Sequence, residues 1–130
     1  MPGVSDVFKQ GLVTYCNRAK RKLLEVKKNT LKENGAVSEK TAKEMAKNGA
    51  FITGADVCVS ITGIAGPGGA TDEKPVGLVY IACSYNIQVT VREFHFKGER
   101  NKVSESSVVN ALILLRECII ADTEKSAKKD

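Results

Sequence analysis

Hydrophobic positions along this chain alternate between strand-like and helix-like spacing, which predicts an α/β domain. Phe8–Tyr15 has the β-branched and aromatic content of a short strand. Two short helical segments are predicted to follow: Arg18–Val26, opened by Asn17 with Leu23 and Leu24 turned inward, and a turn from Asn29 or Thr30 to Gly35.

The clearest helix of the first half is predicted to begin after Ser38, a residue type that caps helix N-termini. Its apolar positions recur three and four residues apart and form one inward stripe. They are Ala42, Met45, Ala46, Gly49 and Ala50. Gly54 ends this helix, and Ala55–Ile61 follows as a nearly all-apolar strand of the kind that is covered on both faces.

The second half is predicted to begin with an antiparallel hairpin. Its strands are Val76–Ser84 and Ile87–Phe96, joined by a tight turn at Tyr85-Asn86. In the last strand, the two valines near the start and the two phenylalanines near the end fall on opposite faces. We therefore expect a bulge near Arg92.

A long helix is predicted from Lys102 to about Ala121, followed by a charged tail over residues 122–130 that should fray. Its apolar stripe is Val103, Ser107, Ala111, Leu114, Leu115 and Cys118. Together these elements predict one domain over residues 2–121, with the fold of a three-layer α/β/α sandwich around a mixed sheet.

The segment between two of the predicted strands, residues 62–75, contains four glycines and two prolines. Long loops inside compact domains are uncommon and are usually functional or disordered. Walker A and dinucleotide fingerprints do not fit, because this loop leads into a strand rather than a helix. A row of backbone N–H groups from Gly66 to Ala70, with Thr62, Thr71 and Lys74, would instead hold a phosphate, a sugar or an oxyanion. A merely structural loop is the alternative.

Composition narrows the class of protein. No apolar run approaches the roughly 20 residues that cross a bilayer, and the first residues do not resemble a signal peptide, so no membrane partner is expected. The four cysteines lie far apart without Cys-x-x-Cys spacing. This argues against a metal site and fits reduced, mostly buried thiols of a cytoplasmic protein. No cofactor is predicted.

The net charge of +5 is unevenly placed. Residues 9–47 carry 11 Lys or Arg against 4 Glu, whereas the rest of the chain carries 9 against 11 acidic residues. Nucleic-acid binding would favour aromatic residues interleaved with this basic segment, but only Phe8 and Tyr15 lie within or beside it. A solvated helix surface is the favoured interpretation, and a nucleic-acid partner is not expected.

Four side chains are candidates for chemistry. Tyr15 and Lys20 flank a predicted strand-to-helix turn that would project both toward one pocket. A lysine acts as a general base when burial lowers its pKa, although a lysine within Arg-Ala-Lys-Arg-Lys is more often a surface residue. His95 lies inside a strand, which makes a Ser-His-Asp or metal site a weak interpretation. Arg100 would either pair with a phosphate or stay solvated.

Five segments of the chain occur in an order that identifies a family. They are Gly11–Lys20, Gly35–Glu39, Thr62–Gly69, Glu73–Gly77 and Phe96–Arg100. In these segments the chain resembles, over about residues 2–120, the CinA C-terminal domain family of competence/damage-inducible proteins. These are the nicotinamide-nucleotide amidases, also called PncC, whose fold is an α/β/α sandwich with a mixed sheet.

The resemblance implies an amidohydrolase that converts nicotinamide mononucleotide to nicotinate mononucleotide and ammonia in the pyridine nucleotide cycle. It implies that Lys20 takes the proton of a nucleophilic serine and that Tyr15 relays or orients it. Glu99 and Ser104 depart from the family pattern, the latter where many relatives have a second arginine, so phosphate binding is expected to be weaker or reorganised. The implied substrate-binding residues are Thr62, Gly63, Ile64, Ala65, Gly66, Gly68, Gly69, Lys74 and Arg100.

Family members usually begin with a strand and a helix carrying Glu-Ser-Cys-Thr-Gly-Gly, whose serine is the nucleophile. The 130 residues contain no such motif, and neither Ser60 in a strand nor Ser38 at a helix cap replaces it. Loss of a nucleophile removes nearly all catalysis, so we expect this chain alone to be impaired or inactive. A non-catalytic pyridine-nucleotide-binding or interaction module is the alternative. An absent strand would expose a sheet edge, so a homo-oligomer is expected.

Overall fold

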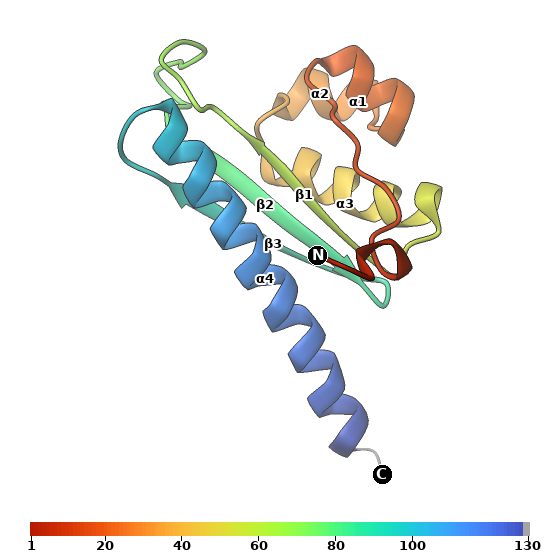
Figure 1. Ribbon diagram of the computed structural model, residues 1–130. Helices are drawn as coiled ribbons and strands as arrows, with labels where there is room; N and C mark the ends of the chain where they lie inside the picture. The colour runs from red at the N-terminus through yellow and green to blue at the C-terminus, as the bar shows by residue number, and fades with distance from the viewer. Residues whose placement is uncertain (129–130) are drawn as a thin grey trace.

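The structure is a computed structural model that describes residues 1–128 (Figure 1). Three helices precede three strands, and a long helix closes the chain. The elements are a 3-10 turn η1 (Val4–Asp6), α1 (Asn17–Leu24), α2 (Lys28–Asn34), α3 (Glu39–Thr53), β1 (Val57–Gly63), β2 (Leu78–Tyr85), β3 (Gln88–His95) and α4 (Arg100–Lys128).

The sheet has the order β1-β2-β3, and both strand pairs are antiparallel. The α/β class is therefore confirmed, but the predicted mixed sheet is wrong within the described residues. The reason is that Phe8–Tyr15 forms no strand, so the sheet contains no strand that could run parallel to another. This segment, which we call the strap, is extended, and its exposed side chains include Phe8, Val13 and Tyr15.

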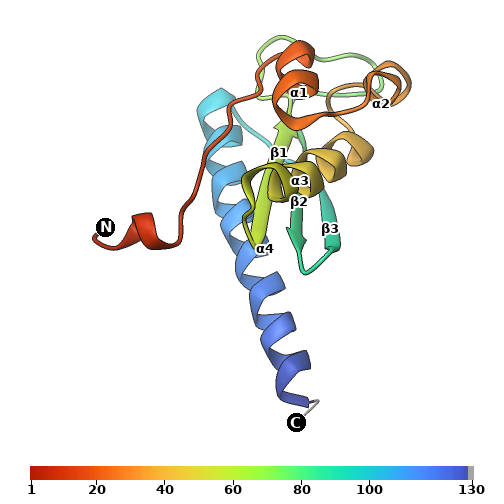
Figure 2. The same ribbon diagram turned by 90° about the vertical axis from the view of Figure 1, so that its right-hand side faces the viewer.

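Strand alternation divides the core between two helices on opposite faces of the sheet (Figures 1 and 2). Odd-numbered β2 residues pack with α4 in a cluster of Val79, Ile81, Cys83, Val103, Ala111 and Leu114. Ala82, on the other face, packs with Ala42 and Ala46 of α3. The described sheet thus has a helix on each face, while the three-layer α/β/α sandwich stays a prediction.

The hairpin is confirmed, but its turn lies at Asn86-Ile87 and its register runs without a bulge from Leu78↔His95 to Tyr85↔Gln88. The expected bulge near Arg92 is wrong because simple alternation already separates the two sets of side chains. Val89 and Val91 pack on the α3 side, whereas Phe94 and Phe96 pack on the α4 side.

The predicted boundaries of α3 are confirmed. Ser38 accepts a hydrogen bond from the Thr41 backbone N–H at 3.2 Å, and Gly54 ends the helix in the left-handed region. In α1, Leu24 is buried as predicted, but Leu23 is 43% exposed. The inner stripe of α4 is also confirmed, whereas the helix continues past the predicted end at Ala121 to Lys128. The rest of the predicted tail, residues 129–130, lies outside the described residues.

Candidate functional site

The predicted site residues gather at the end of the sheet where β1 ends. In both views α1, α2, the loop between β1 and β2, and the start of α4 lie at this end (Figures 1 and 2). Four segments that are distant in sequence therefore contribute to one region of the molecule.

Lys20 is buried, contrary to the surface position that its basic neighbourhood favours. It lies on α1 with 6% of its surface exposed, and its Nζ donates a hydrogen bond to the Thr14 backbone carbonyl at 2.6 Å. Burial lowers the pKa of Lys20 below 10.5, while the nearby Cys16 acts in the opposite direction. A partly desolvated amine of this kind is what a general base requires.

Tyr15 does not share the buried environment of Lys20. Its side chain is 86% exposed, and no hydrogen bond joins it to Lys20 within residues 1–128. The difference arises because the strap has no strand neighbour that would fix alternate side chains on opposite faces. The relay or orienting role of Tyr15 stays a prediction.

The glycine-rich loop is held in one shape by its own backbone. At its neck, the Ile64 N–H donates to the Leu78 carbonyl at 2.9 Å and the Gly77 N–H donates to the Ile64 carbonyl at 2.7 Å. Near its tip, Thr71 and Lys74 exchange backbone hydrogen bonds of 2.9 and 3.2 Å. The loop is therefore closed at two points.

Within the loop, burial differs from residue to residue. Ile64 and Gly66 are buried, Ala65 is half-buried, and Gly63, Gly68 and Gly69 are exposed. Gly66 has a φ of 85°, and a Cβ there would lie 2.6 Å from a methyl carbon of Val76. Only glycine fits this position, which brings the backbone of the loop close to its return segment.

The polar side chains predicted to bind substrate are engaged with backbone carbonyls. The Thr62 hydroxyl donates to Ala36 at 2.7 Å, and the Lys74 Nζ donates to Asn34 at 2.6 Å. Arg100, at the start of α4, donates to the Gly66 carbonyl at 2.9 Å. These three bonds tie β1 and the loop to the α2–α3 junction and to α4. A guanidinium has five N–H donors and an ammonium three, so each cation keeps further donors.

Two serines, Ser60 and Ser38, have structural roles. The Ser60 hydroxyl is buried and donates to the Ala42 carbonyl at 2.7 Å, and Ser38 caps α3.

The cysteine thiols are free. Cys83 is buried, Cys58 and Cys118 are half-buried, and Cys16 is exposed. The expectation of mostly buried thiols is therefore met fully by one cysteine and partly by two, and it is wrong for Cys16. Burial is the main cause of the raised pKa of Cys58. Burial also raises the pKa of Cys83, which reaches about 12. A protonated thiol is a poor nucleophile.

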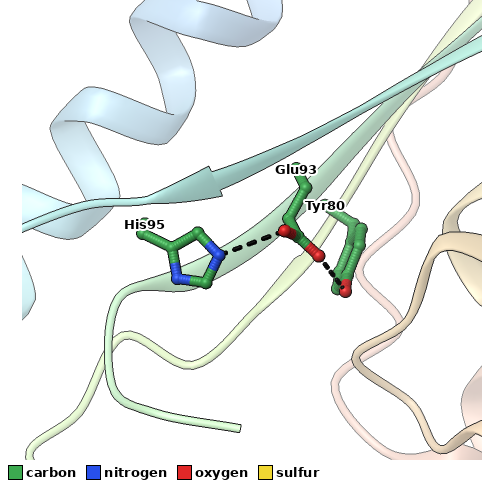
Figure 3. Close-up of polar contacts among 3 residues, drawn as sticks. All are labelled: Tyr80, Glu93 and His95. Carbon is green, nitrogen blue, oxygen red and sulfur yellow. Dashed lines mark hydrogen bonds and ion pairs between the residues drawn. The ribbon is translucent and has the colours of Figure 1, made fainter.

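A polar network that the sequence did not indicate lies on the α3 face, beside Thr62. Thr62 is paired with Tyr80, and Tyr80 with Glu93, across the sheet. The Tyr80 hydroxyl donates to one carboxylate oxygen of Glu93, while His95 Nε2 lies 3.1 Å from the other (Figure 3).

These contacts change the proton affinity of both partners. The hydrogen bond to Glu93 is the main cause that raises the pKa of Tyr80 to about 12. Hydrogen bonds from Tyr80 and then from His95 lower the pKa of Glu93. Strand alternation puts Glu93 and His95 on one face, but only the register brings Tyr80 beside them.

In the described residues, no group of three His, Cys, Asp or Glu side chains could hold a metal ion. Nor is any helix there both long and apolar enough to cross a membrane.

Comparison with known proteins agrees with this geometry. The CinA C-terminal domain matches residues 1–119. A competence-damage inducible protein of Clostridium novyi (strain NT) is 50% identical over 119 residues, which are 92% of this chain and 29% of that protein. A relative from Acetivibrio thermocellus is 46% identical, again over 92% of this chain and 29% of its own length. The chain thus spans less than a third of these curated relatives.

Solved structures match over a larger share of their length. The competence/damage inducible protein CihA from Agrobacterium tumefaciens is 40% identical with a TM-score of 0.87, covering 90% of this chain and 72% of that one. A competence damage-inducible protein A from Klebsiella pneumoniae is 32% identical with a TM-score of 0.88, covering 92% and 74%. Sequence and fold therefore agree that the chain belongs to the CinA C-terminal domain family.

Proposed function

We propose that this chain carries part of the active site of an amidohydrolase that acts on nicotinamide mononucleotide. The reaction breaks the carboxamide C–N bond with one water molecule and yields nicotinate mononucleotide and ammonia. The observation that carries the proposal is the buried Lys20, whose lowered pKa suits it to accept a proton from a nucleophilic hydroxyl. Family membership supplies the substrate class.

The residues around Lys20 have distinct proposed roles. Tyr15 orients or relays the proton, which requires the strap to bring its ring toward Lys20 when the substrate is bound. Exposed backbone N–H groups at Gly68 and Gly69 hold the phosphate or the developing oxyanion. Arg100 uses the donors that do not contact Gly66 to bind the phosphate.

The nucleophile is not among these 130 residues, because they lack Glu-Ser-Cys-Thr-Gly-Gly and because Ser60 and Ser38 have structural roles. We therefore expect the 130-residue chain alone to release little or no ammonia from nicotinamide mononucleotide. Joined at its N-terminus to the family segment that carries the serine, it should become active.

The test compares ammonia release by the chain with and without that segment. In the active form, Lys20→Met should remove nearly all turnover, whereas Lys22→Met, on the exposed face of the same helix, should leave it unchanged. Equal turnover in the two variants would contradict the role of Lys20. Full turnover by the 130 residues alone would show that the nucleophile lies within them.

A second candidate function is a non-catalytic pyridine-nucleotide-binding module. It is favoured by the lack of the Glu-Ser-Cys-Thr-Gly-Gly motif in these residues, while Lys74 and Arg100 keep N–H donors beyond those that contact backbone carbonyls. In that case nicotinamide mononucleotide should raise the melting temperature of the chain, because a ligand that binds only the folded state stabilises it. Ammonia should then be released by neither form.

A further inference from the structure

Two cysteines from distant parts of the chain lie together in the core between β2 and α4. Cys83 of β2 is 1% exposed and belongs to the cluster that includes Ile81 and Leu114. Cys118 of α4 is half-buried and packs against the same cluster. Strand alternation directs Cys83 toward α4, as it does Ile81. Cys118 lies one helical turn after Leu114, on the inner stripe. Both thiols, which we call the thiol pair, therefore share one layer of the core.

The two thiols of the pair are close neighbours. Burial is the largest cause that raises the pKa of Cys83 to about 12, and Cys118 supplies the next causes through its charge and a side-chain hydrogen bond. Thiol groups interact in this way only at short range. A disulfide requires two sulfur atoms that face each other at short range from neighbouring elements, and the thiol pair has this arrangement.

Polar contacts on both sides of Cys118 hold α4 against the hairpin. Glu117, the preceding residue, forms an ion pair with Arg92 of β3. One turn later, Asp122 accepts a hydrogen bond of 2.8 Å from Asn86 at the hairpin turn. Because these contacts bracket Cys118, they keep its thiol above β2 and in line with its partner.

A cavity of about 380 Å³ leads from solvent to the thiol pair. Both cysteines line it, and its other lining residues include Thr90 and Arg92 of β3 and Lys125 of α4. These last three side chains are exposed, so the cavity is reached from water. One water molecule takes about 30 Å³ of liquid volume. The cavity therefore has ample space for an oxidant as small as hydrogen peroxide.

Cys118 is expected to react before Cys83. The thiolate is the form that attacks an oxidant, and the raised pKa of the buried Cys83 keeps that thiol protonated. The sulfur of Cys118 is also the more exposed of the two. Two cations and two carboxylates line the cavity, so their charges balance and favour a thiolate only weakly. We therefore expect oxidation over minutes to hours.

We propose that Cys83 and Cys118 form a redox-active dithiol that hydrogen peroxide converts to an intramolecular disulfide. The Cys118 thiolate attacks one oxygen of the peroxide, the O–O bond breaks, and hydroxide leaves and takes up a proton to form water. Cys118 is then a sulfenic acid. The Cys83 sulfur attacks the Cys118 sulfur, the S–S bond forms, and the S–O bond breaks. The leaving hydroxide takes the Cys83 proton as a second water, so two thiols lose two electrons and one peroxide gains them.

The thiol pair is separate from the candidate amidase site. Cys83 lies two residues before the end of β2 at Tyr85, which is the hairpin end of the sheet. Lys20 belongs to α1, which lies at the end of the sheet where β1 ends (Figures 1 and 2). The thiol chemistry therefore does not depend on the proposed reaction, and it can be tested on the 130-residue chain.

The test treats the reduced chain with hydrogen peroxide, blocks the remaining thiols with N-ethylmaleimide after unfolding, and maps them by mass spectrometry. Cys16→Ser is used throughout, because the exposed Cys16 thiol would otherwise link two chains. Proteolysis after glutamate separates the other cysteines. Glu73 lies between Cys58 and Cys83, and another glutamate directly precedes Cys118. We expect one peptide pair that joins Cys83 to Cys118, with Cys58 alkylated, and dithiothreitol should restore both thiols.

The matched control is Cys58→Ser. Cys58 is also half-buried, but it faces α3, since a Cβ at Gly49 would lie 2.7 Å from its Sγ. This control should still form the disulfide, whereas Cys118→Ser should leave Cys83 reduced. Because a disulfide restricts the unfolded chain, oxidation should also raise the melting temperature by about 10 °C. Circular dichroism melting measures this rise, which Cys118→Ser should lack.

Three outcomes would overturn the proposal. In the first, both thiols of the pair are still alkylated after prolonged treatment. In the second, Cys118 becomes a sulfinic acid while Cys83 stays free, which would mean that the second thiol does not reach the first. In the third, Cys58 is found in the linked peptides. The peptide map of the chain that keeps these three cysteines decides among these outcomes even if a serine variant does not fold.

Discussion

α3 and α4 pack on opposite faces of the same sheet, but they differ in how many large apolar side chains they leave exposed. α3 has 15 residues, a capping serine, a terminating glycine and one buried stripe of small residues with Met45. α4 has 29 residues, and six of its large apolar side chains are exposed, against two, Val103 and Leu114, among its buried residues. The comparison shows that α3 keeps its apolar stripe against the sheet, whereas most large apolar side chains of α4 lie outside its buried stripe.

The sharpest test of this difference lies within α4 itself. Leu114 has no exposed surface, whereas Leu112, two residues earlier, is 61% exposed. Leu114→Ala should lower the free energy of unfolding by about 3 kcal/mol, because it removes buried surface and leaves a cavity. Leu112→Ala should change it by less than about 0.5 kcal/mol, because most of that side chain is already in solvent. Urea denaturation of both variants measures this, and equal losses would contradict the difference in burial between the two leucines.

A second test concerns the close approach of α3 to the sheet. Ala42, Ala46 and Ala82 have no exposed surface and form one cluster. Ala46→Leu should destabilise the fold by about 2 kcal/mol, because the added carbons have no space between helix and strand. Val109→Leu on the exposed side of α4 is the control and should have little effect. Thermal unfolding that gives similar melting temperatures for both would refute the tight packing of α3.

The third test removes the cap that starts α3. Ser38→Ala should cost about 1 kcal/mol, since the Thr41 backbone N–H loses its hydrogen-bond acceptor. Ser106→Ala within α4 should be close to neutral, because that hydroxyl caps no helix end. Chemical denaturation distinguishes the two, and an unaffected Ser38→Ala protein would mean that the cap contributes nothing.

The smallest expected effect is a pH dependence from Lys20, whose pKa is lowered in the folded state by burial. Below that lowered pKa, Lys20 is protonated in both states, and the cost of its buried charge is fully present. Between it and 10.5, the unfolded chain binds more protons, so the free energy of unfolding of the wild type rises with pH.

Lys20→Met should lack this rise. Its stability relative to the wild type should therefore fall as the pH increases toward 10.5 and become constant above it. Lys22→Met, at an exposed position of α1, should show no such trend. Parallel stability curves for wild type and Lys20→Met would indicate that burial does not shift the lysine.

Much of the fold was predictable from local pattern. The apolar spacing and capping chemistry of α3 lie within its own sequence, and so do the alternation of the hairpin strands and the inner stripe of α4. The five ordered motifs also sufficed to identify the family. Such features depend on residues close together in the chain, so their physical cause can be recognised without knowing where other segments lie.

The environment of the candidate site depended on contacts between distant segments. Lys20 has a surface-like sequence neighbourhood, and its burial follows from how α1 and Thr14 pack. Lys74 and Arg100 look like free cations in the sequence, yet the fold places each on a backbone carbonyl. The network of Tyr80, Glu93 and His95 exists only because the strand register aligns them.

Local sequence was therefore enough to predict α3, the antiparallel hairpin, the inner stripe of α4 and the family. Packing was needed to show that the strap is not a strand and that Lys20 is buried while Tyr15 is exposed. The physical reason is that helix and turn preferences act within a few residues. Burial, hydrogen-bond partners and pKa are set by the neighbours that packing supplies, and these neighbours come from anywhere in the chain.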